Sequence, residues 1–307
     1  MEEFRKDYFL NRYALISSKR SKRPHFIKHH QKEIDKSCYF CKGNEKQTPK
    51  ELYVYPEKDN WEIRVFHNKF PAVTSRNNTI MKKKGMLVSY GSFGYHEVIV
   101  ESPKHRQGLW DLSQGKIKNV LDVYNNRIKE NEKKSIKYVS LFKNHGLMAG
   151  ASVKHSHTQL IAYSHIPSTI KEKEDAVSKI KNPYEKLLKS EMKSKRMCFE
   201  NSNFVSFCPY ASRFHYEIVI FPKRHVLKST ELNNDEIISL AEIMKKILTK
   251  LKNLGDDYNF YFQNGIKNMR FHIEIMQRSS QIGGFELSTG CFINSISPED
   301  AAKFYRK

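Results

Sequence analysis

The sequence predicts an α+β fold made of two copies of a strand–helix–strand unit. Residues 95–105 and residues 215–225 carry one pattern: two aromatic or imidazole side chains, Glu, three β-branched residues, and a Pro-containing turn that ends on His. A Phe-x-Asn motif closely followed by Gly recurs at the same spacing, at residues 142–144 and 262–264. Markers that recur at a fixed spacing are typical of an internal repeat, and the β-branched runs predict strands.

A helix is predicted between these markers in each half, because apolar residues recur there at the spacing of one helix face. In the second half, Ser229 or Thr230 is predicted to cap the helix, and Gly255 lies just beyond its end. The apolar residues are Ile117, Val120, Leu121, Tyr124 and Ile128 in the first half, and Ile237, Leu240, Ala241, Met244, Ile247, Leu248 and Leu251 in the second.

A His-x-His-x-Gln motif carries the clearest sign of chemistry. On a strand, His155, His157 and Gln159 point to one face, while Ser156 and Thr158 point to the other. A histidine that is neutral near pH 7 can attack phosphorus if another group fixes its tautomer and orientation. The alternative is a surface pair, or part of a metal-ligand set without chemistry.

The residues upstream of this motif favour an anionic ligand. Asn144, Gly146, Gly150, Ala151 and Ser152 are small or polar, so backbone N–H groups there could approach a phosphate closely. In the second half, residues 270–275 read Arg-Phe-His-Ile-Glu-Ile, so one imidazole and the amide are missing. This asymmetry predicts one reaction centre per chain.

Composition and charge narrow the class of protein. A chain of 307 residues with 39% hydrophobic content can bury a large core. No apolar run is long enough for a membrane span, and the first residues lack the apolar core of a signal peptide, so a cytoplasmic protein without a membrane partner is expected. The net charge of +21 suits phosphate-bearing partners, or else reflects a lysine-rich solvated surface.

The cysteines argue against a disulfide framework. There are five, an odd number, and Cys38 and Cys41 alone are spaced as a unit. A Cys-x-x-Cys pair in a reducing compartment is typical of a metal or redox site, although it can also be unmetallated. Cys198, Cys208 and Cys291 are expected to be small buried hydrophobes.

Six blocks, taken in order along the chain, resemble the galactose-1-phosphate uridylyltransferase family of the histidine triad superfamily. Within that family the chain is more similar to the ADP-glucose phosphorylase-like branch. The blocks are residues 12–24, residues 38–49, residues 61–72, the His-x-His-x-Gln strand, residues 283–290 and residues 298–302.

The resemblance implies a particular architecture. Two histidine-triad-like repeats would form an extended antiparallel sheet with helices packed on one side. Residues 1–170 would make the N-terminal repeat, with the Cys pair and His-x-His-x-Gln, and residues 171–307 a degenerate repeat on the sugar and acceptor side. A homodimer is also compatible with the resemblance.

The resemblance further implies nucleotidyl transfer. His157 would attack the α-phosphorus of a UDP- or ADP-hexose, and the covalent nucleotidyl-histidine would pass its nucleotide to a hexose 1-phosphate or to inorganic phosphate. Gln159 would bind a phosphoryl oxygen, and Ser152 would donate to the β-phosphate. The substrate-binding residues would be Arg20, Arg23, Asn68, Asn144, Gly150, Phe285 and Glu286.

One structural zinc ion is implied by the same resemblance. Its ligands would be Cys38, Cys41, His105 and His155, a closed Cys₂His₂ set. A second metal site would use His225 and His272 in the C-terminal half, but the lack of a Cys-x-x-Cys ahead of them puts it in doubt. His272 and Glu274 are instead expected to form a polar network.

Two other functions fit part of the pattern. One is a histidine-triad hydrolase or phosphorylase of dinucleoside polyphosphates or adenylated nucleic acid, for which a charge of +21 would be natural. The other is a nucleotide- or RNA-binding protein without catalysis. Nucleic acid is the less favoured partner, because aromatic and basic residues do not clearly interleave on one strand face. The base, the sugar, the acceptor and the oligomeric state stay open.

Overall fold

The computed structural model describes residues 2–22 and 38–307, and its largest element is a sheet of ten strands. All neighbouring strands in this sheet are antiparallel, and their order is β10-β11-β12-β14-β13-β8-β9-β7-β4-β3. The strands are β3 (Glu51–Tyr55), β4 (Ile63–His67), β7 (Gly94–Val100), β8 (Tyr138–His145), β9 (His157–Tyr163), β10 (Met197–Glu200), β11 (Phe204–Phe207), β12 (Ile218–Pro222), β13 (Tyr258–Gln263) and β14 (His272–Gln277).

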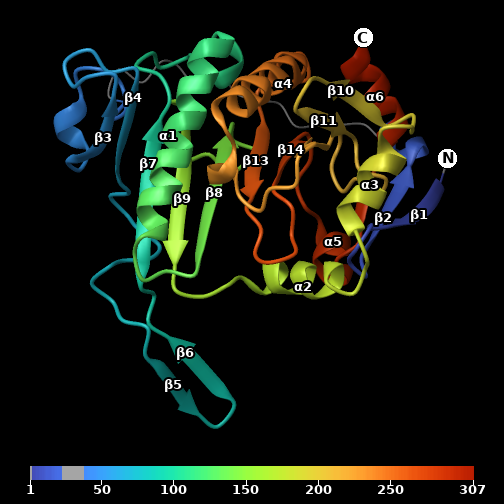
Figure 1. Cartoon of the computed structure of the whole chain (residues 1–307), viewed down its shortest axis with the longest axis horizontal. Helices are drawn as coiled ribbons and strands as arrows, with labels where there is room; N and C mark the ends of the chain where they lie inside the picture. Colours follow the sequence, from blue (N-terminus) through green and yellow to red (C-terminus); the bar gives the residue numbers. More distant parts are fainter. Residues whose placement is uncertain (1, 23–37) are drawn as a thin grey trace.

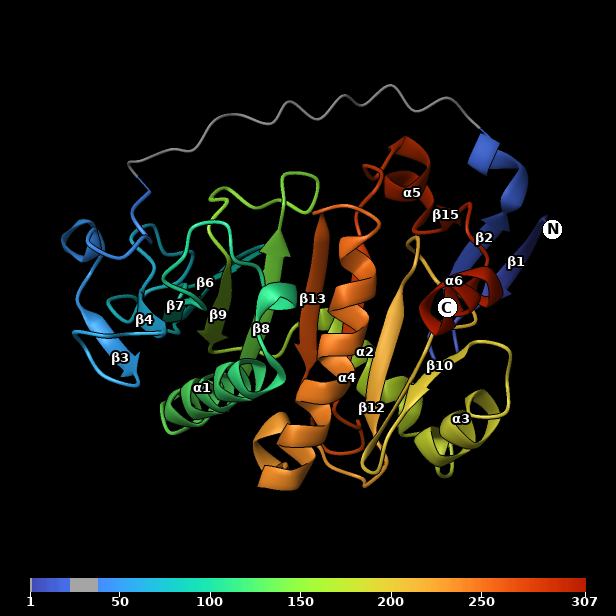
Figure 2. The same cartoon turned by 90° about the horizontal axis from the view of Figure 1, so that it is seen from above.

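The two halves of the chain share this sheet without a break. Strand β8 of the first half pairs with β13 of the second, from Tyr258 opposite His145 to Phe262 opposite Leu141. In Figure 2 the two strands lie side by side near the middle of the molecule. The predicted α+β fold with an extended antiparallel sheet is therefore confirmed.

Two long helices cover one face of the sheet. Helices α1 (Gln114–Glu132) and α4 (Asn234–Lys252) pack together there over the largest apolar core, as predicted (Figure 1). The predicted cap of the second helix is wrong. Asn233 caps it through a capping box with Glu236, whereas Ser229 begins a short 3-10 helix, η4 (Ser229–Glu231).

The opposite face is covered differently in the two halves. In the second half, helices α2 (Ser168–Val177) and α3 (Pro183–Glu191) pack on it through a separate apolar cluster, so helices lie on both faces there. In the first half, the segment around Cys38 and Phe40 packs on β7 instead. Among the described residues, the cover that packs on this side of the first half is therefore the cysteine segment rather than a helix.

Of the remaining elements, η3 (Leu109–Asp111) packs against helix α4, and the small sheets lie outside the ten-stranded sheet. A three-stranded sheet of β1, β2 and β15 sits at the C-terminal side with α5 and α6, and the β5–β6 hairpin projects from the body (Figure 1). The bounds of these remaining elements are β1 (Glu2–Lys6), β2 (Tyr13–Ser17), η1 (Ser18–Lys22), η2 (Glu45–Gln47), β5 (Met81–Lys84), β6 (Leu87–Tyr90), η3 (Leu109–Asp111), α5 (Gly284–Thr289), β15 (Phe292–Asn294) and α6 (Pro298–Arg306). No helix in the part of the chain described here is long and apolar enough to cross a membrane.

Aligning the two halves by their sequence motifs places strand residues opposite partners that point to the other face of the sheet, as a shift of one residue would. Phe142 and Phe262 match in sequence, but Phe142 pairs with Tyr261, and antiparallel partners point to the same face. Glu97 likewise faces helix α1, whereas Glu217 lines a pocket on the opposite face. A slip of one residue reverses the face of every side chain in a strand. The sequence spacing therefore locates the repeat but does not match equivalent side chains.

Candidate functional site

His157 begins strand β9, and its ring is held in one tautomer. Its Nδ1 lies 2.8 Å from the carbonyl oxygen of His155. Because a carbonyl only accepts, Nδ1 carries the proton and Nε2 keeps its lone pair. The side chain is 5% exposed, and burial lowers its pKa below the ordinary 6.5, so the imidazole is neutral. A neutral ring with an open nitrogen can act as a nucleophile.

Gln159 lies on the same face and is oriented by His96. The Nδ1 of His96 accepts the N–H of Ala72 at 3.2 Å, so its Nε2–H donates to Gln159 Oε1 at 2.8 Å. The amide of Asn68 lies 3.4 Å from the same oxygen. Both contacts use the amide oxygen, so neither of them occupies the NH₂ group of Gln159. Sequence reasoning assigned no role to His96, although it stands in the repeated marker beside Glu97.

The loop between β8 and β9 holds the predicted phosphate-binding residues. Gly146 has φ +84°, and a Cβ there would lie 2.2 Å from Asp257 Oδ1. The same carboxylate oxygen accepts the N–H of Met148 at 2.7 Å. Gly150, with φ +82°, and Ser152 are exposed in this loop. A carboxylate from the second half thus fixes the loop of the first half.

Asn144, at the end of β8, is also held from the second half. Asn259 donates through Nδ2 to Asn144 Oδ1 at 2.9 Å and to the carbonyl of Ala149 at 2.9 Å. Arg278 donates to Asn259 Oδ1 at 2.8 Å and fixes that amide. Sequence reasoning missed Asp257, Asn259 and Arg278, because no motif marks them and their partners are distant in the chain.

Replacement of Gly146 by Ala is expected to displace this loop. The positive φ and the approach of Asp257 would together cost about 1–3 kcal/mol. We expect a lower midpoint of thermal unfolding and weaker nucleotide binding. The matched control is Gly115→Ala in helix α1, where a Cβ meets open space, and we expect it to be neutral or slightly stabilising. A Gly146→Ala variant with the stability and affinity of the parent protein would contradict this account.

Cys38, Cys41, His105 and His155 converge as predicted. Their four donor atoms all lie within 4.8 Å of one another. Cys41 Sγ is 3.4 Å from His105 Nδ1 and 3.5 Å from His155 Nδ1, and Cys38 Sγ is 3.7 Å from His155 Nδ1. His155 Nε2 lies 2.7 Å from the carbonyl of Ser102, so it carries the proton and Nδ1 presents its lone pair to the sulfur atoms. The cluster could bind a metal ion.

The cysteine segment is in direct contact with His157. The ring of Phe40, between the two cysteines, packs edge-on against His157 with centroids 5.2 Å apart, and against Phe66 at 5.6 Å. The ring of His155 lies 6.2 Å away. The position of His157 therefore depends on the Cys₂His₂ cluster in two ways: His155 is two residues away in the chain, and Phe40 packs against the His157 ring.

The two C-terminal histidines do not form a second such cluster. His225 is exposed and lies 3.6 Å from Glu185, while His272 is buried with its Nε2 3.3 Å from Glu274. Among residues 2–22 and 38–307, the Cys₂His₂ set is the one group of three or more potential ligands. Lys173 lies 3.3 Å from His272 Nε2 and 3.1 Å from Glu274, which confirms the polar network expected there.

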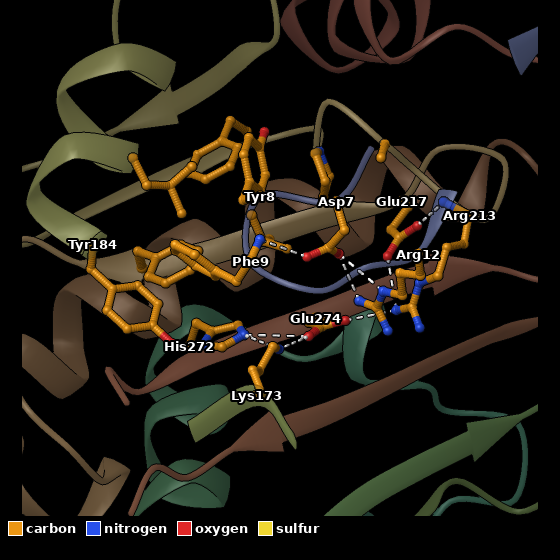
Figure 3. A pocket seen from close by; sticks show the side chains of 16 residues that line it. Asp7, Tyr8, Phe9, Arg12, Lys173, Tyr184, Arg213, Glu217, His272 and Glu274 are labelled. Carbon is orange, nitrogen blue, oxygen red and sulfur yellow. Dashed lines mark hydrogen bonds and ion pairs between the residues drawn. The ribbon is translucent and has the colours of Figure 1, made fainter. Parts of the chain in front are cut away.

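Figure 3 shows how that network fills the second repeat's pocket. The loop between β1 and β2 and helix α2 supply charges that pair inside it, and the enclosed space is about 50 Å³, against about 300–1,000 Å³ for a typical small-molecule site. Lys173 stands at the nitrogen of His272 that corresponds to the open Nε2 of His157. This supports one reaction centre per chain. The ion pairs are Asp7–Arg12, Lys173–Glu274, Arg213–Glu217 and Arg213–Glu274.

The other predicted substrate-binding residues lie elsewhere. Arg20 is exposed on η1, and Arg23 lies outside the described residues. Phe285 is 42% exposed on α5, and the carboxylate of Glu286 accepts the N–H of Gly283 at 3.0 Å as the cap of that helix. In Figure 2, α5 lies to the right of β13, on the side of the molecule where the C-terminus is marked, and β9 lies to the left of β13. The structure thus brings His157, Gln159 and Asn68 together beside the Cys₂His₂ cluster, whereas α5 lies away from these residues.

Comparison with known proteins shows the family to which this chain belongs. Residues 1–167 match the family model described as the N-terminal domain of galactose-1-phosphate uridyl transferase. The chain belongs to the galactose-1-phosphate uridylyltransferase family. Family membership confirms the predicted enzyme class, a nucleotidyltransferase. Residues 112–304 also match a family model of a domain of unknown function.

The relatives place the chain in the ADP-glucose phosphorylase-like branch of the uridylyltransferase family. The ADP-glucose phosphorylase of Arabidopsis thaliana is 34% identical over an alignment of 325 residues, gaps included. The alignment covers 99% of this chain and 92% of that protein. A crystal structure of that enzyme with bound ADP-glucose superposes with a TM-score of 0.85 at 31% identity, covering 100% of this chain and 99% of that chain. The galactose-1-phosphate uridylyltransferase of Thermotoga maritima is 26% identical over 330 residues, with coverages of 100% and 98%.

Proposed function

We propose that this chain transfers a nucleoside monophosphate from a nucleotide sugar to a phosphate-bearing acceptor through His157. The observation that carries the proposal is the bond from His157 Nδ1–H to the His155 carbonyl, which leaves the lone pair on Nε2 of a neutral ring. Membership in the uridylyltransferase family supports the same reaction class. The similarity to ADP-glucose phosphorylase supports an ADP-hexose as donor and inorganic phosphate as acceptor, with a UDP-hexose and a hexose 1-phosphate as the alternative pair.

The reaction would proceed in two displacements. His157 Nε2 attacks the α-phosphorus, an N–P bond forms, and the P–O bond to the sugar 1-phosphate breaks with its electron pair on the leaving oxygen. Because that phosphate is already a good leaving group, no strong general acid is needed. The acceptor phosphate then attacks the same phosphorus, and the N–P bond breaks to restore the neutral imidazole.

The residues around His157 would stabilise the negative charge of the phosphoryl oxygens. Gln159, whose oxygen is held by His96, would donate from its NH₂ group. Ser152 and the backbone N–H groups around Gly150 would bind the neighbouring phosphate, and Asn68 and Asn144 would line the site. Gln159 and Asn144 are already oriented by His96 and Asn259, and such preorganised donors are what electrostatic stabilisation of a transition state requires.

A second copy of the chain would supply the remaining contacts. Helix α5, which carries Phe285 and Glu286, lies away from β9 within one chain (Figure 2), and Arg20 is exposed on η1. We propose that these three residues serve the site of a partner in a homodimer. Arg23 is proposed for the same role from the sequence alone. The oligomeric state in solution, measured by sedimentation or light scattering, checks the dimer.

Zinc is the proposed occupant of the Cys₂His₂ cluster. Zn–S and Zn–N bonds of about 2.3 and 2.0–2.1 Å in a tetrahedron place sulfur and nitrogen about 3.5 Å apart. The three observed Sγ to Nδ1 distances, 3.4, 3.5 and 3.7 Å, agree with that value. All four protein ligands leave no position open for substrate, so the ion would hold structure rather than take part in the reaction.

Incubation with a panel of nucleotide sugars tests the reaction. We expect the intact mass to rise by one adenylyl group with ADP-glucose, or by one uridylyl group with a UDP-hexose. Phosphate or a hexose 1-phosphate should then remove the adduct. Absence of any adduct across the panel, with intact metal and folding, would contradict the proposed function.

The net charge of +21 supports nucleic acid as the alternative partner, and salt distinguishes the two. Binding that neutralises six or more phosphates weakens by roughly 10³-fold or more between about 50 and 200 mM salt. A nucleotide sugar carries two phosphates, so its affinity should fall only modestly over this range. RNA that binds at about 150 mM salt and displaces the nucleotide from His157 would favour the alternative.

A further inference from the structure

A buried ion pair lies directly behind His157, on the face of β9 opposite to the reacting side chains. Lys143 of β8 lies 2.5 Å from a carboxylate oxygen of Glu101, and both side chains are essentially inaccessible. Ser156 and Thr158, which flank His157, point to this rear face, as strand alternation requires. They bring their hydroxyl groups to the carboxylate at 2.7 and 2.5 Å.

Every donor of the Lys143 ammonium is used. One goes to Glu101, one to Ser156 Oγ at 2.9 Å, and one to the carbonyl oxygen of His157 itself at 2.9 Å. An ammonium group has three donors and no acceptor, so its position is fully determined by these bonds. The ion pair therefore holds the peptide unit of His157 as well as the hydroxyl groups on both sides of it.

The carboxylate of Glu101 is equally saturated. Besides Lys143, Ser156 and Thr158, it accepts the hydroxyl of Tyr124 from helix α1. The next residue, Ser102, presents the carbonyl that fixes the tautomer of His155. The segment that follows β7 therefore contacts both parts of the His-x-His motif: Ser102 bonds the ring of His155, and Glu101 bonds the residues that flank His157.

Stability alone gives little reason for this arrangement. Taking two charges out of water costs several kcal/mol per ion, and an apolar pair of similar volume is often as stable or more stable. What an apolar pair would not supply is the set of directed bonds to residues 156–158. A displacement of about 1 Å at a reacting group can cost 10²-fold in rate.

We infer that Glu101 and Lys143 are positioning residues for His157. By holding the His157 carbonyl and the hydroxyl groups of Ser156 and Thr158, the pair sets the strand so that Nε2 meets the α-phosphorus in line. This inference rests on the proposed function, in which His157 is the nucleophile. It adds two residues to the reaction that touch neither substrate nor metal.

The double variant Glu101→Gln/Lys143→Met tests this role. It leaves no lone buried charge, so we expect folding and metal content close to those of the parent protein. The affinity for the nucleoside monophosphate should stay within about twofold, while adduct formation in a single turnover should slow by about 10- to 100-fold. A purely structural role would lower stability and affinity together with the rate.

A remote buried ion pair serves as the matched control. Glu191 and Arg196, 2.8 Å apart in the second half, are neutralised in Glu191→Gln/Arg196→Met, and we expect the rate of adduct formation to be unchanged. A milder variant, Ser156→Ala/Thr158→Val, keeps the charges and should slow the step several-fold. Parent rates in both the double variant and this milder one would overturn the inference.

The nuclear magnetic resonance signal of the His157 Nδ1–H separates this inference from the proposed function. The bond to the His155 carbonyl should protect this proton in the parent protein, and the signal should shift or broaden in Glu101→Gln/Lys143→Met. A shifted signal in a protein that never forms an adduct would refute the proposed nucleophile and keep the positioning role. An unshifted signal together with a parent rate of adduct formation would refute the positioning role alone.

Discussion

Replacement of His157 by Ala is expected to abolish the covalent adduct and to lower kcat/KM by about 10⁴-fold or more, the order of magnitude lost when a covalent nucleophile is removed. The reason is that the neutral Nε2 of His157 is the one nucleophile that the proposed reaction uses. The intact mass after incubation with ADP-glucose, together with steady-state turnover, measures both effects. Folding and metal content should be retained, because the Cys₂His₂ cluster does not include this ring.

Two other histidines in the same region give the controls. His165, exposed just beyond the far end of β9, should tolerate Ala without loss of adduct or turnover. His155→Ala should lose the metal first, and with it stability. An adduct that persists in His157→Ala would show that another side chain is the nucleophile.

Replacement of Cys41 by Ser is expected to release the metal and to lower the free energy of unfolding by about 4 kcal/mol or more. Cys41 Sγ faces both histidine ligands, so its loss opens the cluster at its centre. Adduct formation should slow as well, because Phe40 packs against His157 from the same segment. Elemental analysis should find one zinc per chain in the parent protein and much less in the variant.

Cys291→Ser is the matched control for this substitution. Cys291 lies just after α5, outside the Cys₂His₂ cluster, so its variant should keep the metal and the unfolding midpoint of the parent protein. A parent protein purified without zinc, or with two zinc ions per chain, would contradict the single structural site. A Cys41→Ser variant that keeps its metal would contradict the ligand set.

The parts of the site that the sequence predicted are those that depend on strand alternation or on motif spacing. His157 and Gln159 share a face because their positions differ by two, and Ser156 and Thr158 share the other for the same reason. The Cys₂His₂ set was predicted from the resemblance to the family. The structure brings its four side chains together, and their role as metal ligands stays a prediction, like the roles of Arg20, Phe285 and Glu286.

What the sequence did not reveal depends on which strands become neighbours. Asp257 and Asn259 act on the β8–β9 loop only because β13 pairs with β8. Glu101 and Lys143 meet because β7 and β8 flank β9 on either side. Sequence similarity between the repeats also matched residues that lie on opposite faces of the sheet, because a shift of one residue changes the face on which a side chain lies.

The pairing of β8 with β13 has a consequence for how this protein can change over evolutionary time. After a duplication, a copy that no longer performs chemistry is ordinarily free to diverge or to be deleted. Under the proposed function the C-terminal copy performs no chemistry, yet it carries Asp257 and Asn259, which hold the β8–β9 loop and Asn144 of the N-terminal copy. Mutations of these residues in the C-terminal copy would then lower the turnover of the N-terminal site, so selection on that site would also preserve the C-terminal copy as a scaffold.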